Sequence, residues 1–224
     1  MIKVDNICKS FKQETVLKNV SAYFEPGEIS GIIGKNGSGK TVFFKIICGF
    51  MKPDSGEVRF YDETDGEYIT IGKDVDFPEN IGVIIEAPGF LPYRSGFSNL
   101  IYLASLRGKI GREEVIRAMK LVGLDPNLKK GVGKYSLGMR QRLGIAQAIM
   151  EDPEFLILDE PFNGLDEQGV REMRELLLSL KAQDKTILIA SHMKEDIDLL
   201  CDVVYEMKNG VLEQISPVTE EDIC

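Results

Sequence analysis

Eight residues near the N-terminus have the types and spacing of a loop that holds phosphate groups. They fit the pattern GxxxxGK[ST] and are Gly34, Lys35, Asn36, Gly37, Ser38, Gly39, Lys40 and Thr41. The glycines let the backbone curl so that several N–H groups point inward at phosphate oxygens. We expect Lys40 to reach the β- and γ-phosphates of a nucleotide, and the Thr41 hydroxyl to bind Mg²⁺. The alternative is a chance glycine-rich turn.

A second candidate group is an acidic pair at the end of an apolar segment. Asp159 and Glu160 directly follow residues 155–158, which read Phe-Leu-Ile-Leu. Ligands of open α/β sheets bind outside the carboxyl ends of the strands, so we expect both carboxylates beside the phosphate loop. Asp159 is then expected to hold Mg²⁺ through water, and Glu160 to polarise the water that attacks the γ-phosphate. The alternative is a solvated strand end.

The elements that must position these groups alternate between short apolar strands and helices. We expect strands at 2–4, 20–24, 28–33, 57–61, 69–71, 81–85, 155–158, 186–190, 203–207 and 210–215. We expect helices at 40–48, 136–150, 167–183 and 193–200, and a helical pattern from 98 to about 122 that Gly123 ends. This alternation predicts a mainly parallel sheet covered by helices, with a helical insertion at roughly 88–150.

Composition narrows the functional class. The 224 residues are 43% hydrophobic, enough for a sizeable core. There are 27 basic and 36 acidic residues, so the net charge is −9, which disfavours general nucleic-acid binding. No apolar run approaches the ~20 residues of a membrane span. The first residues do not read as a signal peptide, so we expect a cytoplasmic protein. Reduced thiols, rather than disulfides or a metal site, are expected at Cys8, Cys48, Cys201 and Cys224.

A third stretch carries a family resemblance. Residues 135–142, Tyr-Ser-Leu-Gly-Met-Arg-Gln-Arg, resemble the signature sequence of the ABC family, which is LSGGQ followed by a QR pair. Residues 161–166 resemble the family's D-loop, and Ser191 with His192 resembles its switch histidine. Order and approximate spacing match over essentially the whole chain. The sequence is therefore similar to the ATP-binding subunits of ABC transporters.

The resemblance implies a fold and a domain division. The expected fold is α/β, a P-loop NTPase (RecA-like) core with a mainly parallel sheet, an N-terminal antiparallel β subdomain and an inserted α-helical subdomain. One ABC ATPase domain would span 1–224. The nucleotide-binding core and the β subdomain would occupy 1–87 and 151–224, and the helical signature subdomain 88–150.

The resemblance also assigns roles around ATP and Mg²⁺. Phe11 matches the aromatic residue that stacks on adenine, although an ordinary core aromatic is the alternative. His192 matches the residue that contacts the γ-phosphate and links it to Glu160, so the catalytic set is Glu160, His192 and Lys40. Residues expected around ATP are Phe11, Gly34, Lys35, Asn36, Gly37, Ser38, Gly39, Lys40, Thr41, Val42, Glu86, Ser136, Gly138 and Asp166. Those expected around the metal are Thr41, Glu86 and Asp159.

The sequence departs from the family pattern at four positions. Leu137 and Met139 replace a glycine and the glutamine of the signature, which keeps the backbone N–H groups for phosphate binding. Glu86 stands where the family has the glutamine of its Q-loop. A carboxylate there binds a metal more strongly but adds negative charge beside ATP, so we expect a changed turnover; the alternative is a solvated loop glutamate. Val42 replaces a second hydroxyl residue and removes a contact to the α-phosphate.

The resemblance implies partners as well. In this family two ATP-binding subunits dimerise head to tail around two ATP molecules, with Ser136 and the Gly138 N–H meeting the γ-phosphate held by the partner. Transport would need separate transmembrane permease subunits, docked near Gly89, Phe90, Leu91 and Tyr93, unless those residues are buried. The signature string and Glu-Ala-Pro at 86–88 are most similar to bacitracin-export and lantibiotic-immunity exporters, which implies export of a drug, antibiotic or peptide by a protein peripheral on the inner face of the cell membrane.

Three other functions stay open at this point. One is a soluble non-transport ABC ATPase, such as an assembly or repair factor. Another is a small-molecule phosphotransferase, against which the signature stretch and His192 argue, since neither has a role in that chemistry. The last is a nucleotide-binding regulator without turnover, against which Glu160 and His192 argue.

Overall fold

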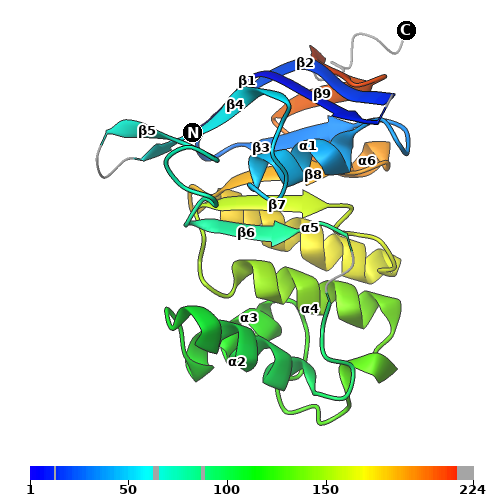
Figure 1. The fold of residues 1–224 in the computed structure, drawn as a ribbon. Helices are drawn as coiled ribbons and strands as arrows, with labels where there is room; N and C mark the ends of the chain where they lie inside the picture. The colour runs from blue at the N-terminus through cyan, green and yellow to red at the C-terminus, as the bar shows by residue number, and fades with distance from the viewer. Residues whose placement is uncertain (13, 63–65, 87–88, 216–224) are drawn as a thin grey trace, which may run out of the picture.

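The computed structural model describes residues 1–12, 14–62, 66–86 and 89–215, and Figure 1 shows the arrangement of their elements. The strands are β1 (Ile2–Phe11), β2 (Glu14–Phe24), β3 (Ile29–Ile33), β4 (Ser55–Asp62), β5 (Glu67–Thr70), β6 (Ile81–Ile84), β7 (Phe155–Asp159), β8 (Thr186–Ala190), β9 (Val203–Lys208) and β10 (Val211–Ile215). The helices are α1 (Lys40–Ile47), α2 (Gly96–Arg107), α3 (Arg112–Leu121), the 3-10 turn η1 (Val132–Lys134), α4 (Leu137–Ile149), α5 (Glu167–Lys181) and α6 (Lys194–Leu200).

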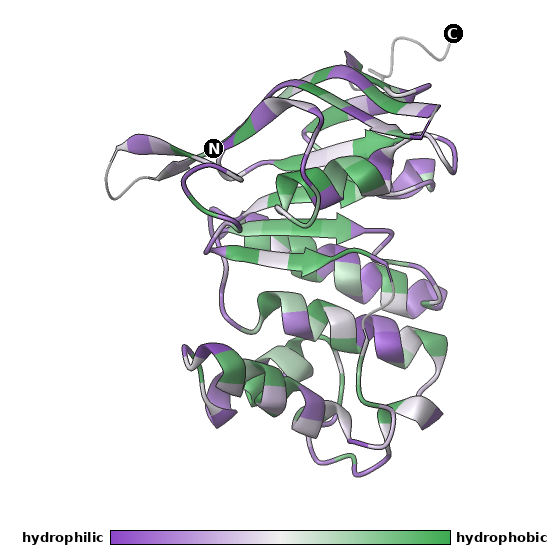
Figure 2. Ribbon diagram, in the orientation of Figure 1, coloured by the Kyte–Doolittle hydropathy of each residue, from purple (hydrophilic) through white to green (hydrophobic). Residues whose placement is uncertain are grey.

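The larger sheet has the strand order β10-β9-β3-β8-β7-β6, and every pair in it except β10–β9 is parallel. The prediction of a mainly parallel sheet is therefore confirmed. The central strands are apolar on both faces (Figure 2). Alternate residues of β7 enter different cores: Leu156 lies in one and Ile157 in the other. A strand buried on both faces needs this continuous apolar run.

The second sheet is antiparallel, in the order β2-β1-β4-β5, as the expected β subdomain requires. It shares a core with α1 and one face of the larger sheet, and Phe60 and Phe155 meet there edge to face at 5.3 Å. Strands β1 and β2 are much longer than the expected 2–4 and 20–24. They pair with each other as a long hairpin. This pairing keeps residues in the strands even where the alternation of polar and apolar side chains is weak.

Helices α2, α3 and α4 lie in the span expected to be helical, at the end of the molecule farthest from the antiparallel sheet (Figure 1). The helical pattern of 98–122 is two helices rather than one. Gly108, with φ +66°, ends α2 in a left-handed conformation, and α3 begins only at Arg112. Gly123, at φ +73°, follows α3 as predicted. The division at 88–150 stays a prediction, and its first boundary, at 87 and 88, lies outside the described residues.

The last two strands form the expected hairpin. Asn209 and Gly210 connect β9 to β10 with φ values of +52° and +81°, which suits a tight turn. Three cysteines are free thiols, Cys8, Cys48 and Cys201, while Cys224 lies outside the described residues. In the part of the chain that the structure describes, every helix is too short or too polar to cross a bilayer.

Candidate functional site

The candidate phosphate loop connects β3 to α1, as the sequence predicts. Gly34 has φ +154°, and a Cβ there would lie 2.4 Å from the Met207 carbonyl oxygen. Gly39 is the N-cap of α1 at φ +113°, and a Cβ there would lie 2.9 Å from Leu17. Both positions therefore require glycine, because a side chain would strain the backbone and collide with neighbouring strands.

The groups that line this loop suit a phosphate. Lys40 is 6% exposed, and its ammonium donates to the Gly34 carbonyl at 2.7 Å. The Ser38 hydroxyl is buried and has no hydrogen-bond partner within the described residues. An orphaned buried hydroxyl beside a cation and a helix N-terminus is a polar site without its ligand partner. Lys35, Asn36 and Gly37 form the exposed crest of the loop.

The first hydroxyl after the loop meets the first carboxylate after β7. Thr41 Oγ1 donates to Asp159 Oδ2 at 2.7 Å, which joins residues 118 positions apart. Within the described ranges there is no group of three or more His, Cys, Asp or Glu residues that could hold a metal on their own. Mg²⁺ is bound in proteins by one or two oxygen side chains together with phosphates and waters. The Thr41–Asp159 pair fits that donor set.

Glu160 and His192 also come together. Glu160 Oε2 lies 2.8 Å from His192 Nδ1, although the two residues stand at the ends of different strands. Glu160 has φ +51°, a conformation that a non-glycine residue seldom adopts. Its N–H donates to the Ala190 carbonyl at 2.9 Å, which fixes the turn against the end of β8. The backbone strain is thus held by the neighbouring strand.

Sequence reasoning missed a residue that supports this turn. Gln141 on α4 donates from Nε2 to the Glu160 carbonyl at 3.2 Å. The glutamine belongs to the QR pair of the signature stretch, so a motif match was present, but its contact depends on how α4 packs beside the sheet.

Phe11 ends β1 and is 43% exposed, so it is not the ordinary core aromatic that was the alternative. The Lys9 ammonium lies 5.7 Å from the Phe11 ring centroid. Asp54 holds this strand end, because its carboxylate accepts from Lys9 Nζ at 2.8 Å and from Ser10 N at 2.6 Å. Hydrogen bonds from the Lys9 side chain and the Ser10 backbone hold the pKa of Asp54 below its usual range.

Glu86 follows β6 with φ +62° and forms an ion pair with Lys45 of α1 at 2.7 Å. Its side chain is 64% exposed. The sequence interpretations were a metal ligand or a solvated glutamate, and neither included Lys45. Val42, on the same helix, is partly buried and packs against the core.

The signature stretch begins α4. Ser136 is its N-cap, as predicted, and Ser136 Oγ accepts from Met139 N at 3.1 Å. Leu137 is 57% exposed and lies against Gly164, where a Cβ would come within 2.4 Å of it. Asp166 is the N-cap of α5 and accepts from Gly169 N at 2.8 Å. The signature stretch therefore touches the loop that leads from Glu160 into α5.

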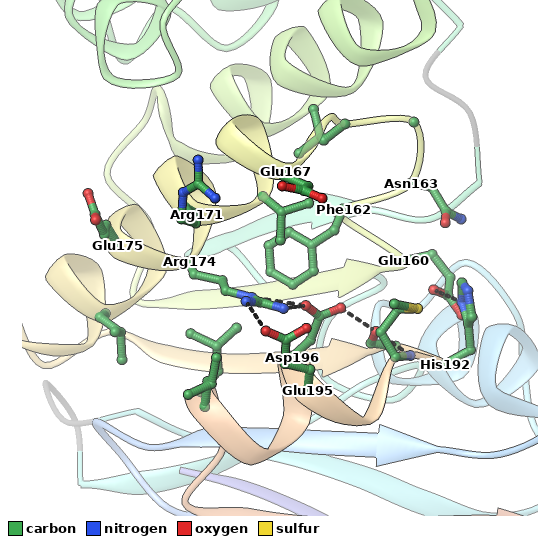
Figure 3. Close-up of a pocket in the computed structure, with 18 residues that line it drawn as sticks. Glu160, Phe162, Asn163, Glu167, Arg171, Arg174, Glu175, His192, Glu195 and Asp196 are labelled. Carbon is green, nitrogen blue, oxygen red and sulfur yellow. Dashed lines mark hydrogen bonds and ion pairs between the residues drawn. The ribbon is translucent and has the colours of Figure 1, made fainter.

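A cavity of about 870 Å³ extends from Glu160 and His192 along the groove between α5 and α6 (Figure 3).

The segment expected to meet a permease contains both a packed and an exposed aromatic residue. Phe90 packs against the core, whereas Tyr93 is 77% exposed.

Comparison with known proteins gives the family. A family model described as ABC transporter matches residues 17–163. The chain is 42% identical over 213 residues to an uncharacterised ABC transporter ATP-binding protein, YybJ, of Bacillus subtilis (strain 168), with 95% of each chain covered. It is 38% identical over 221 residues to the bacitracin transport ATP-binding protein BcrA of Enterococcus faecalis, covering 98% of this chain and 70% of that one.

Among solved structures, cbiO1 from Clostridium perfringens, part of the ABC transporter complex cbiONQ, superposes with a TM-score of 0.81. The two sequences are 29% identical, and the match covers 99% of this chain and 92% of that one. The chain therefore belongs to the ABC transporter family and is one of the family's ATP-binding subunits, an ATPase.

Proposed function

We propose that this subunit binds ATP with Mg²⁺, hydrolyses it at Glu160, and powers export of a drug, antibiotic or peptide through separate transmembrane permease subunits. The observation that carries the proposal is the meeting of two pairs at one edge of the sheet, Thr41 with Asp159 and Glu160 with His192. The likeness to a bacitracin transport ATP-binding protein supports the substrate class.

Phosphate binding falls to the loop before α1. Lys40 exchanges the Gly34 carbonyl for phosphate oxygens, and the orphaned Ser38 hydroxyl gains a partner. Thr41 and Asp159 would hold Mg²⁺, which when bound neutralises charge on the β- and γ-phosphate oxygens. Phe11 offers an exposed ring on which adenine stacks.

Hydrolysis falls to Glu160. One of its carboxylate oxygens contacts His192. The other makes no hydrogen bond within the described residues and is free to accept a proton from the attacking water. His192, with a side chain 53% exposed, reaches toward the γ-phosphate while keeping Glu160 in place. The hydrogen bond from Gln141 holds the carbonyl of the same glutamate.

A second ATP-binding subunit, identical or related, completes the site. Ser136 and the Gly138 N–H stand at the start of α4, where a helix N-terminus favours an anion such as the γ-phosphate held by the partner. Asp166 lies on the loop that contacts this stretch. The exposed Tyr93 marks the face that meets the permease, which would place the subunit in the cytoplasm against the inner face of the membrane.

The test has two parts. Purified wild-type chain should release phosphate from MgATP, and Glu160→Gln should lower kcat by about a hundredfold or more while leaving ATP binding intact. Phosphate transfer to a small acceptor instead of water would contradict the hydrolase assignment.

The second part is purification of the tagged chain from detergent-solubilised membranes of its host. A co-purifying polytopic protein would support the transporter assignment and identify the permease. Recovery only with soluble partners would contradict it and favour a soluble assembly ATPase.

A further inference from the structure

We propose that Ser191, Asp196 and Arg174 form a positioning unit that fixes His192 in reach of Glu160. The inference rests on the proposed function, in which His192 serves ATP hydrolysis. None of the three residues is assigned to the nucleotide, and each acts through the loop that carries the histidine.

Hydrogen bonds join the residues on both sides of His192 to Asp196. The buried Ser191 hydroxyl donates to Asp196 Oδ2 at 2.8 Å and accepts from the Met193 N–H at 3.1 Å. The residues on both sides of the histidine are thus tied, directly or through one hydroxyl, to a single carboxylate. The Asp196 N–H also donates to the Met193 carbonyl at 3.1 Å. The backbone at His192 therefore has little freedom to turn.

Arg174 anchors Asp196 to a different helix. Its guanidinium, on α5, reaches across the groove to Asp196 Oδ1, with Nε at 3.0 Å and Nη2 at 2.5 Å (Figure 3). Asp196 is only 1% exposed, so this charge is fully desolvated. A second, weaker contact joins Arg174 Nη1 to Glu195, whose side chain is 68% exposed, at 3.3 Å.

Stability alone does not explain this arrangement. A buried ion pair contributes little net free energy to folding, because desolvation of the two charges offsets their attraction. Apolar residues of similar size commonly stabilise a fold as well or better. The surrounding groove is lined by apolar side chains that such residues would join, among them Val170, Leu178 and Leu199. Moreover, α6 receives no side-chain cap from its N-cap residue, Met193. The ion pair instead fixes the orientation of the start of α6. This orientation places His192 beside Glu160 at the end of β7.

The test replaces the ion pair by an apolar pair. In the double variant Arg174→Met/Asp196→Leu no buried charge is left unpaired, so the chain is expected to fold with a Tm close to that of wild type. We expect kcat for ATP to fall about tenfold, with KM changed less than about twofold, since displacement of a catalytic group slows the reaction without removing binding contacts. Ser191→Ala should lower kcat in the same way. Glu195→Gln, which removes only the exposed partner of the same arginine, is the matched control and should resemble wild type.

A second readout does not need hydrolysis. His192 is the single histidine of the chain, so the imidazole Cε1–Hε1 resonance of labelled protein reports on it alone. At fixed pH this resonance should change position in the double variant and in Ser191→Ala, because the ring leaves Glu160, and should stay in place in Glu195→Gln.

The outcomes separate the inference from the proposed function. Folded variants with an unmoved resonance, or with a moved resonance and wild-type kcat, would overturn the positioning role. A wild-type chain without ATPase activity would contradict the proposed function, and the resonance would still decide whether the unit holds His192.

Discussion

Two glutamates with left-handed backbones mark the site at the scale of single residues. Glu160, at φ +51°, and Glu86, at φ +62°, each follow a strand of the parallel sheet directly or by one residue. Such conformations cost about 1–3 kcal/mol for a non-glycine residue, so surrounding contacts must maintain them. For Glu160 the contacts come from Ala190 and Gln141, and for Glu86 from Lys45.

The charge balance of the Lys45–Glu86 pair sets a first prediction. Glu86→Gln removes a negative charge beside bound ATP, so KM for MgATP should fall about two- to threefold, the size of an exposed charge interaction. Lys45→Met leaves the glutamate unneutralised, so KM should rise by a similar factor. Steady-state ATPase assays measure both, and a shift of the two variants in the same direction would contradict an electrostatic role for the pair.

At the scale of elements, helix starts carry much of the chemistry. Helices α1, α4 and α5 have Gly39, Ser136 and Asp166 as their N-cap residues, and all three belong to motifs read from the sequence. A helix N-terminus presents unpaired N–H groups and a partial positive charge, which suits an anion at the starts of α1 and α4. At α5 the Asp166 carboxylate itself takes that place and accepts from Gly169 N.

Ser136 and Ser95 allow the capping and the ligand role to be separated. Both serines cap helices in the same way, Ser136 by accepting from Met139 N at 3.1 Å and Ser95 by accepting from Ser98 N at 3.2 Å. Either serine-to-alanine change should lower the free energy of unfolding by about 1 kcal/mol. Only Ser136→Ala should also reduce ATPase activity. Chemical denaturation and phosphate release measure the two effects, and equal activity loss in Ser95→Ala would argue for capping alone.

Asp54 gives a prediction about pH at the edge of the antiparallel sheet. Its pKa is lowered in the folded chain by the Lys9 and Ser10 hydrogen bonds, so the ionised carboxylate stabilises the fold above its unfolded pKa. That stability disappears as pH falls through the lower, folded value. Asp54→Asn should therefore lower Tm at pH 7 and at pH 5, and the difference from wild type should shrink below about pH 4. A difference independent of pH would rule out the ionised pair as its source.

The sequence predicted the contiguous parts of the site and the elements beside them. The phosphate loop, the Asp159–Glu160 pair and the Ser136 cap are local patterns, and local patterns survive without knowledge of packing. The contacts of Lys45 with Glu86 and of Arg174 with Asp196 join different elements at no fixed spacing, so periodicity could not reveal them. The break at Gly108 was missed for a related reason, since α2 and α3 continue one apolar pattern across it.

At the scale of the whole molecule, the mainly parallel sheet lies between two hydrophobic cores, one on each of its faces. One core includes the helices of 96–149, and the other includes α1 and the antiparallel sheet. Of the proposed catalytic residues, Glu160 directly follows β7, His192 follows β8 after one residue, and Lys40 is the first residue of α1. The hydrogen bond from Gln141 links α4 directly to Glu160 at this edge of the sheet.

ATP-driven pairing of two chains is the prediction at this scale. Glu160→Gln with MgATP should elute as a species of doubled mass in light-scattering chromatography, because unhydrolysed nucleotide holds the partners together. The same protein with ADP should stay at the mass of one chain. Combining Glu160→Gln with Ser136→Ala should shift the ATP sample toward single chains. A mass that does not respond to nucleotide would contradict the shared site.

The lysine of the phosphate loop has a consequence for how nucleotide arrives. Lys40 donates to Gly34 and lies 3.4 Å from the Lys35 carbonyl, so the folded loop itself surrounds the lysine cation. We expect nucleotide binding to exchange these carbonyl partners for phosphate oxygens and to order little new chain. In calorimetry, nucleotide association should lack the large negative heat-capacity change of coupled folding. The entropic cost of ordering a disordered segment should likewise not weaken the affinity.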